Sequence, residues 1–240
     1  GLARSGLASV ELLAEKGANV TACDTRPVEQ LPEAGAVLDR LGVPFRLQSP
    51  EALEGAEWVV ISPGVPADLD LLATARQSGS RVVGEVELAG WFLQGGIIGI
   101  TGSNGKTTTT ALTGHILSSC GIPSQVGGNI GTVPATALVR TSSPGCWNVL
   151  ELSSFQLETI NRFRARIAVL LNVTQDHLDR HHTFASYAGA KARLLETQQP
   201  EDFAVLNADD PVCVELASRT AGQVLWFSLA RKVDPGVFLE

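Results

Sequence analysis

A glycine-rich segment in the middle of the chain restricts its possible folds more than any other feature. Residues 99–108 read Gly-Ile-Thr-Gly-Ser-Asn-Gly-Lys-Thr-Thr, and the apolar run 97–100 overlaps the start of this segment. Such a run before a glycine-rich turn is typical of a buried parallel strand. The residues from Lys106 to about Cys120 are compatible with a helix. A strand, a glycine-rich turn and a helix in this order predict a phosphate-binding loop in an α/β protein.

The residue types in this segment suit a nucleoside triphosphate. Glycines let the backbone approach phosphate oxygens with its N–H groups pointing inward. Lys106 would neutralise the β and γ phosphates, and the Thr107 hydroxyl would bind Mg²⁺. The match to Gly-x-x-x-x-Gly-Lys-Thr is imperfect, because Ile100 stands where the first glycine belongs. The alternative is a glycine-rich turn with a solvated lysine. We predict an ATP site formed by Gly102, Ser103, Asn104, Gly105, Lys106, Thr107 and Thr108.

Length and composition fit one large or two ordinary α/β domains. The chain has 240 residues, of which 44% are hydrophobic, enough for a packed core. No apolar stretch approaches the length of a membrane span, and a net charge of −7 argues against nucleic-acid binding. Four scattered cysteines without Cys-x-x-Cys spacing indicate reduced thiols. We therefore expect a cytoplasmic protein that contacts neither membrane nor nucleic acid.

Apolar and helical segments alternate along the whole chain, which predicts βαβ units and parallel sheets. Before Leu93, strands are expected at 20–24, 59–61 and 81–83, and a helix at 68–78. Later strands are expected at 148–151, 167–172, 203–207 and 224–227. Gln94-Gly95-Gly96 is the best boundary. We expect a Rossmann-like domain over 1–93 and a P-loop ATPase-like α/β domain over 94–240.

A second glycine-rich opening lies at Gly1 to Gly6 and is followed by Asp24 at the end of the next expected strand. This arrangement suits an anion at a helix N-terminus and a sugar or base edge held by the carboxylate. It is not a full Gly-x-Gly-x-x-Gly pattern. A structural turn held by Asp24 is an equally good interpretation. The missing methionine and a start inside a turn suggest that sequence is lacking at both ends.

Polar residues at strand ends in the second half are further candidates. Glu151 follows an apolar strand and is a hard oxygen ligand for Mg²⁺ beside Thr107, or a glutamate near a helix cap. Asn129 lies in a glycine-flanked turn and faces a phosphate or substrate, or is an ordinary turn residue. His177 follows another strand, and a lone loop histidine often has only a structural role. We expect Asp176 or Asp179 to cap the next helical turn, and His181 and His182 to lie on the surface.

Five motifs in this order resemble the Mur ligase family, which builds the peptide stem of bacterial peptidoglycan. They are the phosphate loop, Gly-Gly-Asn-Ile-Gly at 127–131, Glu-Leu-Ser-Ser-Phe-Gln-Leu-Glu at 151–158, Asn-Val-Thr-Gln-Asp-His-Leu-Asp at 172–179 and Tyr-Ala-Gly-Ala-Lys at 187–191. Within the family, the segment at 151–157, Asp24-Thr25-Arg26 and Ser62-Pro63-Gly64 look most like the D-glutamate-adding members.

The resemblance implies an ATP-dependent ligase that joins D-glutamate to UDP-N-acetylmuramoyl-L-alanine through an acyl phosphate, as a cytoplasmic monomer in peptidoglycan precursor synthesis. It implies two Mg²⁺ ions, and a carbamylated Lys191 that helps to hold the second. The implied metal ligands are Thr107, Glu151, His177 and Lys191, and the implied catalytic residues are Lys106, His177 and Lys191. The N-terminal part would bind the UDP-sugar. The implied substrate-binding residues are Ser5, Asp24, Thr25, Arg26, Ser62, Gly64, Asn129 and Ser153.

Three other interpretations stay open at this point. The chain is another Mur-type ligase or a folylpolyglutamate synthase, a nucleotide-binding fragment without catalysis, or a Rossmann oxidoreductase that uses Gly1 to Gly6 and Asp24. The family's C-terminal domain has no counterpart after Glu240. We therefore expect this chain alone to be inactive.

Overall fold

The computed structural model describes residues 1–131 and 133–240. Its α-helices are α1 (Arg4–Glu15), α2 (Pro32–Leu41), α3 (Asp70–Gln77), α4 (Glu85–Phe92), α5 (Lys106–Ser119), α6 (Ser154–Leu157), α7 (Leu178–His181), α8 (Phe184–Glu196) and α9 (Pro211–Leu216). Short 3-10 helices are η1 (Val28–Gln30), η2 (Glu51–Leu53), η3 (Ala135–Arg140) and η4 (Ala217–Arg219). None of the helices in these ranges is long and apolar enough to cross a membrane.

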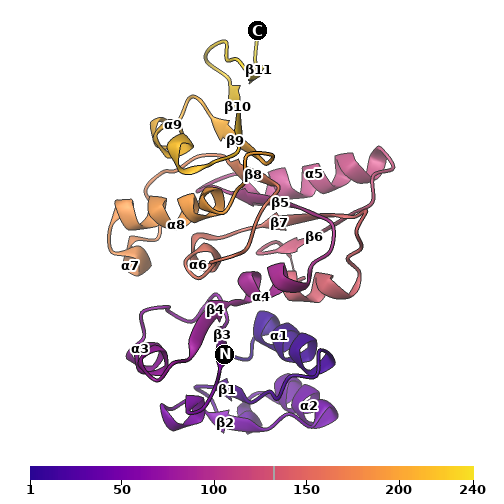
Figure 1. Ribbon diagram of the computed structural model, residues 1–240, viewed down its shortest axis with the longest axis vertical. Helices are drawn as coiled ribbons and strands as arrows, with labels where there is room; N and C mark the ends of the chain where they lie inside the picture. Colours follow the sequence, from indigo (N-terminus) through magenta and orange to yellow (C-terminus); the bar gives the residue numbers. More distant parts are fainter. Residues whose placement is uncertain (132) are drawn as a thin grey trace.

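Most of the second half of the chain is built on one parallel sheet (Figure 1). The spatial order of its seven strands is β11-β10-β9-β8-β5-β7-β6, and every neighbouring pair is parallel. Their bounds are β5 (Gly96–Thr101), β6 (Ser124–Gly128), β7 (Trp147–Glu151), β8 (Ile167–Leu170), β9 (Phe203–Asn207), β10 (Gln223–Ser228) and β11 (Gly236–Phe238). The order reverses at β5, because β5 lies between β7 and β8, and the chain passes from one side of β5 to the other between these two strands. The crevice at such a reversal, at the carboxyl ends of the strands, is where open α/β sheets bind ligands.

Helices cover both faces of this sheet, which explains why its strands read as continuous apolar runs. On one face, Ile98 and Ile100 of β5 form a core with Val149 of β7, against which Leu117 of α5 packs. The larger core on the other face includes residues of α4, α8 and α9. The buried parallel strand and the helix predicted around the phosphate loop are confirmed as β5 and α5.

The N-terminal half contains two small parallel sheets. β1 (Ala22–Asp24) pairs with β2 (Phe45–Leu47), and β3 (Trp58–Ile61) pairs with β4 (Arg81–Gly84). The segment Gly1–Leu2 links the ends of β1 and β3. The Leu2 N–H donates to Asp24 (2.7 Å), and the Ser62 hydroxyl donates to the Gly1 carbonyl (2.9 Å).

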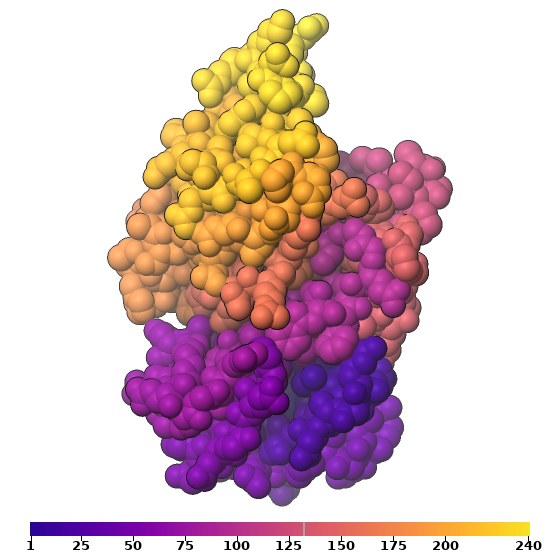
Figure 2. Space-filling model, in the orientation of Figure 1, coloured from indigo at the N-terminus to yellow at the C-terminus, as the bar shows by residue number. Residues whose placement is uncertain are grey.

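Helix α4 lies at the junction of the two halves (Figure 1), and Figure 2 shows the two halves in contact. Val86 and Ala89 of α4 are fully buried in the large core of the seven-stranded sheet. Trp91 near its end meets Trp58 of β3, with ring centroids 4.7 Å apart. Helix α4 therefore packs into the large core of the second half as well as against β3 of the first half.

Candidate active site

The phosphate loop connects the end of β5 to the start of α5. Gly105, the residue before α5, has φ +82°, a conformation that glycine adopts without the strain other residues would have. The first N–H groups of an α-helix have no partner within the helix. The loop therefore directs a cluster of free N–H groups and the positive end of a helix of 14 residues toward any bound anion.

Asn172, just beyond β8, holds this loop in shape. Its side-chain oxygen accepts hydrogen bonds from the N–H groups of Ser103 (3.1 Å) and Asn104 (2.8 Å), and its amide group donates to the Asn104 carbonyl (3.1 Å). The Ser103 hydroxyl lies 2.9 Å from the hydroxyl of Tyr187 on α8. The sequence places Asn172 in a motif, but it does not reveal that Asn172 supports the loop, because 68 residues separate it from Asn104.

Three predicted site residues are brought together at the carboxyl ends of β6 and β7. The Thr107 hydroxyl donates to one Glu151 oxygen (2.8 Å), and the Asn129 amide donates to the other (2.8 Å). Gly128 permits this geometry, because its φ is +93° and a Cβ there would lie 2.3 Å from the Glu151 carbonyl oxygen. The Glu151 side chain is thus buried and fixed next to the start of α5.

Two lysines approach the phosphate loop from different directions. Lys106 donates to the Ser103 carbonyl (2.8 Å), and Lys191 donates from α8 to the Gly102 carbonyl (2.7 Å). Lys191 is 1% exposed. Burial, and next the nearby charge of Lys106, lower the pKa of Lys191 to about 7. Lys191 is therefore partly neutral near neutral pH, unlike a solvated lysine.

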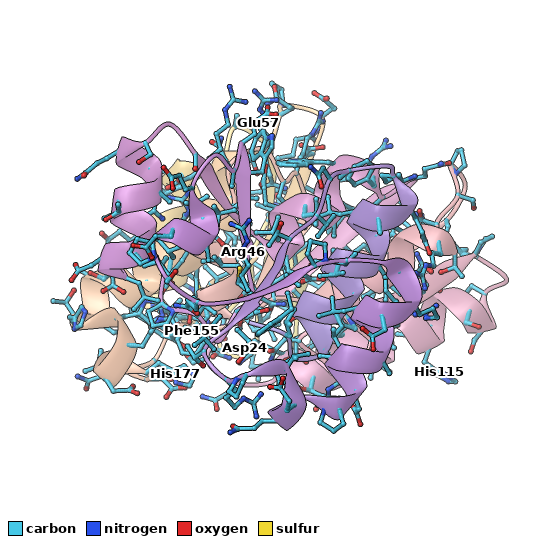
Figure 3. The ribbon with its side chains drawn as sticks, turned by 90° about the horizontal axis from the view of Figure 1, so that it is seen from below. Asp24, Arg46, Glu57, His115, Phe155 and His177 are labelled. Carbon is cyan, nitrogen blue, oxygen red and sulfur yellow. The ribbon has the colours of Figure 1, made fainter. Side chains whose placement is uncertain are left out.

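His177 lies in an aromatic group beside α8. Its ring centroid is 5.0 Å from that of Phe155 and 6.3 Å from that of Tyr187, and Figure 3 shows His177 and Phe155 together, with His115 at the opposite end of the view. The expected surface position of His181 is wrong. His181 is 6% exposed, and its Nε2 lies 2.9 Å from the Ser154 hydroxyl, because its ring packs on Phe155 and Tyr187.

Of the other predictions around His177, the exposure of His182 is confirmed and the aspartate cap is wrong. His182 is exposed, as expected. The expected aspartate cap of the next helix is wrong, because His177 itself is the residue before α7 and no side chain caps it. Asp176 instead accepts a hydrogen bond from the His177 N–H (2.9 Å).

A cleft of about 460 Å³ lies between the N-terminal half and the second half. Its lining includes all six substrate residues that are expected in the first half: Ser5, Asp24, Thr25, Arg26, Ser62 and Gly64. Asn129, Gln156 and Glu85 line it from the other side. Asn129 belongs to both sites, since it lines the cleft and bonds to Glu151. Asn129 therefore links the cleft wall to Glu151 and Thr107 by hydrogen bonds.

Asp24 is 6% exposed and both of its oxygens have partners within the chain. Oδ2 accepts from Leu2 N–H (2.7 Å) and Oδ1 from Arg26 N–H (3.0 Å). Burial acts to raise the pKa of Asp24, but the two backbone hydrogen bonds and the nearby positive charges together outweigh it and lower the pKa. These contacts are those of a carboxylate that holds a turn. The Arg26 side chain is exposed and its Nε lies 3.6 Å from Asp24.

Ser153 does not line the cleft with the other expected substrate residues, and its side chain bonds to the start of α6 instead. Its side chain accepts a hydrogen bond from the Gln156 N–H (3.3 Å), and the Gln156 side chain accepts one from the Ser153 N–H (2.9 Å). The pair forms a capping box at the start of α6. The sequence pattern Ser-x-x-Gln predicts such a capping box, whereas the resemblance implies a substrate contact at Ser153.

The oxygen ligands near the loop fit a magnesium ion. A hydroxyl and a carboxylate, 2.8 Å apart at Thr107 and Glu151, are hard donors, and Mg²⁺ completes its shell with phosphate oxygens and water. Within residues 1–131 and 133–240 there is no group of three or more His, Cys, Asp and Glu side chains that could hold a metal ion alone. Any ion here would thus depend on ligands from a bound phosphate, from water or from a modified side chain.

Comparison with known protein families gives two matches that together span most of the chain. The Mur ligase middle domain matches residues 100–235, and the Mur ligase MurD-like N-terminal domain matches residues 1–84. The chain belongs to the Mur ligase family. The motifs from the phosphate-loop residues 100–108 to Lys191 all lie within the matched middle domain.

Two curated relatives show how this Mur ligase chain aligns with whole proteins. The UDP-N-acetylmuramoylalanine–D-glutamate ligase of Solibacter usitatus is 60% identical over 100% of the chain and 53% of that protein. The protein of the same name from Koribacter versatilis is 50% identical over 100% of the chain and 53% of that protein. The chain spans about half the length of the curated relatives it matches.

Solved structures support the α/β fold of this Mur ligase. A UDP-N-acetylmuramate:L-alanyl-gamma-D-glutamyl-meso-diaminopimelate ligase from Neisseria meningitides matches with a TM-score of 0.61 at 19% identity, covering 96% of this chain and 78% of that one. A murein peptide ligase from Psychrobacter arcticus matches with a TM-score of 0.53 at 18% identity, covering 93% of this chain and 51% of that one.

Proposed function

We propose that the whole gene product containing this chain is an ATP-dependent ligase that joins D-glutamate to UDP-N-acetylmuramoyl-L-alanine. The observation that carries this proposal is the hydrogen-bonded path from the cleft to the phosphate loop through Asn129, Glu151 and Thr107. A substrate carboxylate bound in the cleft near Asn129 would approach the γ-phosphate of ATP bound at the phosphate loop. The names of relatives that are 50–60% identical support the same reaction.

The proposed reaction has two steps. The substrate carboxylate attacks the γ-phosphorus of ATP, which gives an acyl phosphate and ADP. The D-glutamate amine then attacks the acyl carbon, and phosphate leaves. Because charge develops on the transferring phosphoryl group, Lys106 and the N–H groups at the start of α5 would contribute electrostatic stabilisation. Positioning supplies the rest, and no residue of the chain forms a covalent bond with the substrate.

We further propose that Thr107 and Glu151 hold one Mg²⁺, and that His177 and Lys191 help to hold a second. When bound, these ions would supply charge neutralisation for the two anionic reactants. Lys191 cannot bind a cation as an ammonium group. Its lowered pKa provides the neutral amine that adds CO₂, with loss of one proton, to form an anionic carbamate.

In the first half, we propose that Ser5, Thr25, Arg26, Ser62 and Gly64 bind the UDP-sugar. Asp24 would contribute by shaping the turn that presents Arg26. We propose a two-domain organisation and a cytoplasmic monomer, as expected from the sequence. The packing of α4 favours moving the domain boundary from residue 93 to Gly84.

The test is turnover by the whole gene product with ATP, Mg²⁺, UDP-N-acetylmuramoyl-L-alanine and D-glutamate, followed by the release of ADP and of the product. Replacement of D-glutamate by L-lysine or meso-diaminopimelate distinguishes other Mur-type ligases. Lys106→Ala should reduce turnover by about 100-fold or more and leave the melting temperature unchanged. Turnover with another amino acid alone, or full activity of Lys106→Ala, would contradict the proposal.

A further inference from the structure

Two buried glutamates in the first turn of α4 have different hydrogen-bond environments. Glu85 is 2% exposed and Glu87 is 1% exposed. The Glu87 carboxylate accepts hydrogen bonds from three consecutive backbone N–H groups, at residues 161–163, and from the Trp91 indole. Both of its oxygens therefore have donors, which is the environment that stabilises an ionised carboxylate.

Glu85 has donors on one oxygen only. Its Oε1 accepts from the Thr136 N–H (2.6 Å) and the Thr136 hydroxyl (2.8 Å) at the start of η3. Its Oε2 is buried and has no hydrogen-bond partner among the described residues. A negative charge on an oxygen that lacks both water and a donor is unfavourable. Burial accordingly raises the pKa of Glu85, and the two hydrogen bonds from Thr136 offset only part of this rise.

The charged groups around α4 supply no partner for Oε2. Helix α4 packs against α1, β3, β4, α6 and η3, and neither β3 nor α6 contains a charged residue. The charged residues of the other three elements have other contacts. Glu11 and Glu15 of α1 accept hydrogen bonds from Arg140 of η3. Arg81 of β4 lies over the Trp58 ring, and Arg4 of α1 lies on the cleft wall. The helix dipole favours negative charge at this end, but it provides no donor to Oε2.

Glu85 also lines the cleft between the two halves, near Pro134 and Gln156. Pro134 directly precedes η3, so the bonds from Thr136 to Glu85 fix the cleft wall at this point. Arg4 and Arg26 lie on the other side of the same cleft. A second carboxylate charge in the cleft, in addition to that of Asp24, would weaken the attraction of these arginines for an anion.

We propose that Glu85 is a positioning residue that works in the cleft as a neutral carboxylic acid. It anchors the start of η3 through Thr136 without adding a negative charge to the wall that an anionic ligand approaches. This inference rests on the proposed function, because it takes the diphosphate of the UDP-sugar as that anion. The same helix supplies the contrast, since Glu87 anchors the 161–163 segment as a carboxylate.

Glutamine distinguishes the two states, because it resembles a protonated glutamate in shape and charge. With calorimetry and UDP as the probe, Glu85→Gln should bind within about twofold of wild type, whereas Glu85→Ala should bind about tenfold more weakly because Thr136 loses its partner. Glu87→Gln is the matched control. It should lower the melting temperature, since its amide group cannot accept from the backbone N–H groups that face it.

The protonation of the Glu85 carboxyl group can be measured directly, without a ligand. The infrared difference between wild type and Glu85→Gln at neutral pH should contain the carbonyl band of a protonated carboxyl group. Absence of that band, or a loss of tenfold or more in UDP affinity in Glu85→Gln, would overturn the inference. If wild type binds neither UDP nor uridine, the proposed use of the cleft fails and the electrostatic role of Glu85 fails with it, whatever the infrared result.

Discussion

At the scale of single residues, burial separates side chains of the same type into different chemical roles. Lys106 and Lys191 both donate to carbonyls of the phosphate loop. Lys106 is half-buried at the start of α5, beside the loop. Lys191 is fully buried on α8, and its pKa falls to about 7. The first is suited to neutralising phosphate, and the second to reacting as an amine.

The carbamate proposed at Lys191 leads to a residue-level prediction in the whole gene product. Lys191→Ala should lose about 100-fold or more in turnover, because it removes an anionic oxygen ligand from the metal site. A short carboxylic acid added to this variant should restore part of the activity by occupying the vacated space. Lys232→Ala, at an exposed lysine, is the control. Normal turnover in Lys191→Ala, or a loss that no carboxylic acid restores, would contradict the carbamate.

The residues that sequence alone identified are those whose role belongs to a local pattern. Lys106 and Thr107 follow from the loop, and Glu151 from its place at a strand end, and the structure brings the last two within hydrogen-bond distance. Glu85 and His181 could not be found in this way. Their environments come from Thr136 and Ser154, which lie 51 and 27 residues away in the sequence.

At the scale of elements, the shape of the phosphate loop depends on the strand next to β5 as well as on the glycines of the loop. β8 pairs with β5 in parallel, so the two strands end side by side. This placement brings Asn172 to the backbone of Ser103 and Asn104. The strands were predictable from apolar runs, and β9 occupies the expected residues 203–207. The neighbours of each strand were not, because pairing depends on contacts between runs that are distant in the sequence.

Removal of the Asn172 side chain should therefore weaken ATP binding without changing any group that touches phosphate. Asn172→Ala leaves the Ser103 and Asn104 N–H groups without this acceptor, and we expect about a tenfold rise in the Kd for ATP. Asn207→Ala is the matched control at the end of β9, where the amide donates to the Leu171 carbonyl (2.9 Å) and the side-chain oxygen accepts from the Asp209 N–H (2.9 Å). Equal ATP affinities of the two variants in a calorimetric titration would show that Asn172 does not support the loop.

At the scale of the whole molecule, polar groups join the two halves at several points around α4. Arg140 of η3 pairs with Glu11 and Glu15 of α1, and Arg180 donates to the Val65 carbonyl. The residues of each of these pairs are 115–129 positions apart in the sequence. The cleft is built from such contacts, which is why the sequence indicated the binding residues of each half but not the continuous path between them.

Acid stability of the fold should depend on one ion pair, between the buried carboxylate of Asp202 and the partly exposed Arg164, at the base of the large sheet. Asp202 precedes β9, and its carboxylate receives two hydrogen bonds from Arg164, at 2.6 and 2.8 Å, and one from the Gln199 N–H, at 2.7 Å. Burial acts to raise the pKa of Asp202, but these hydrogen bonds and the charges of Arg164 and Arg166 together outweigh it, so the pKa in the folded chain lies below the usual value. A lowered carboxyl pKa stabilises the fold above the unfolded-state value of about 3.9, and this stabilisation is lost as the pH falls through the folded-state pKa.

Asp202→Asn should consequently lower the melting temperature at neutral pH, and the difference from wild type should shrink as the pH falls below about 4. Glu201→Gln is the control, because Glu201 pairs with the same arginine but is exposed, and exposed pairs contribute little to stability. Melting curves followed by circular dichroism between neutral and acidic pH measure both differences. A gap between Asp202→Asn and wild type that stayed constant over this range would show that the pair does not couple protonation to folding. The loss at neutral pH would then come from the altered packing and hydrogen bonding of the asparagine side chain.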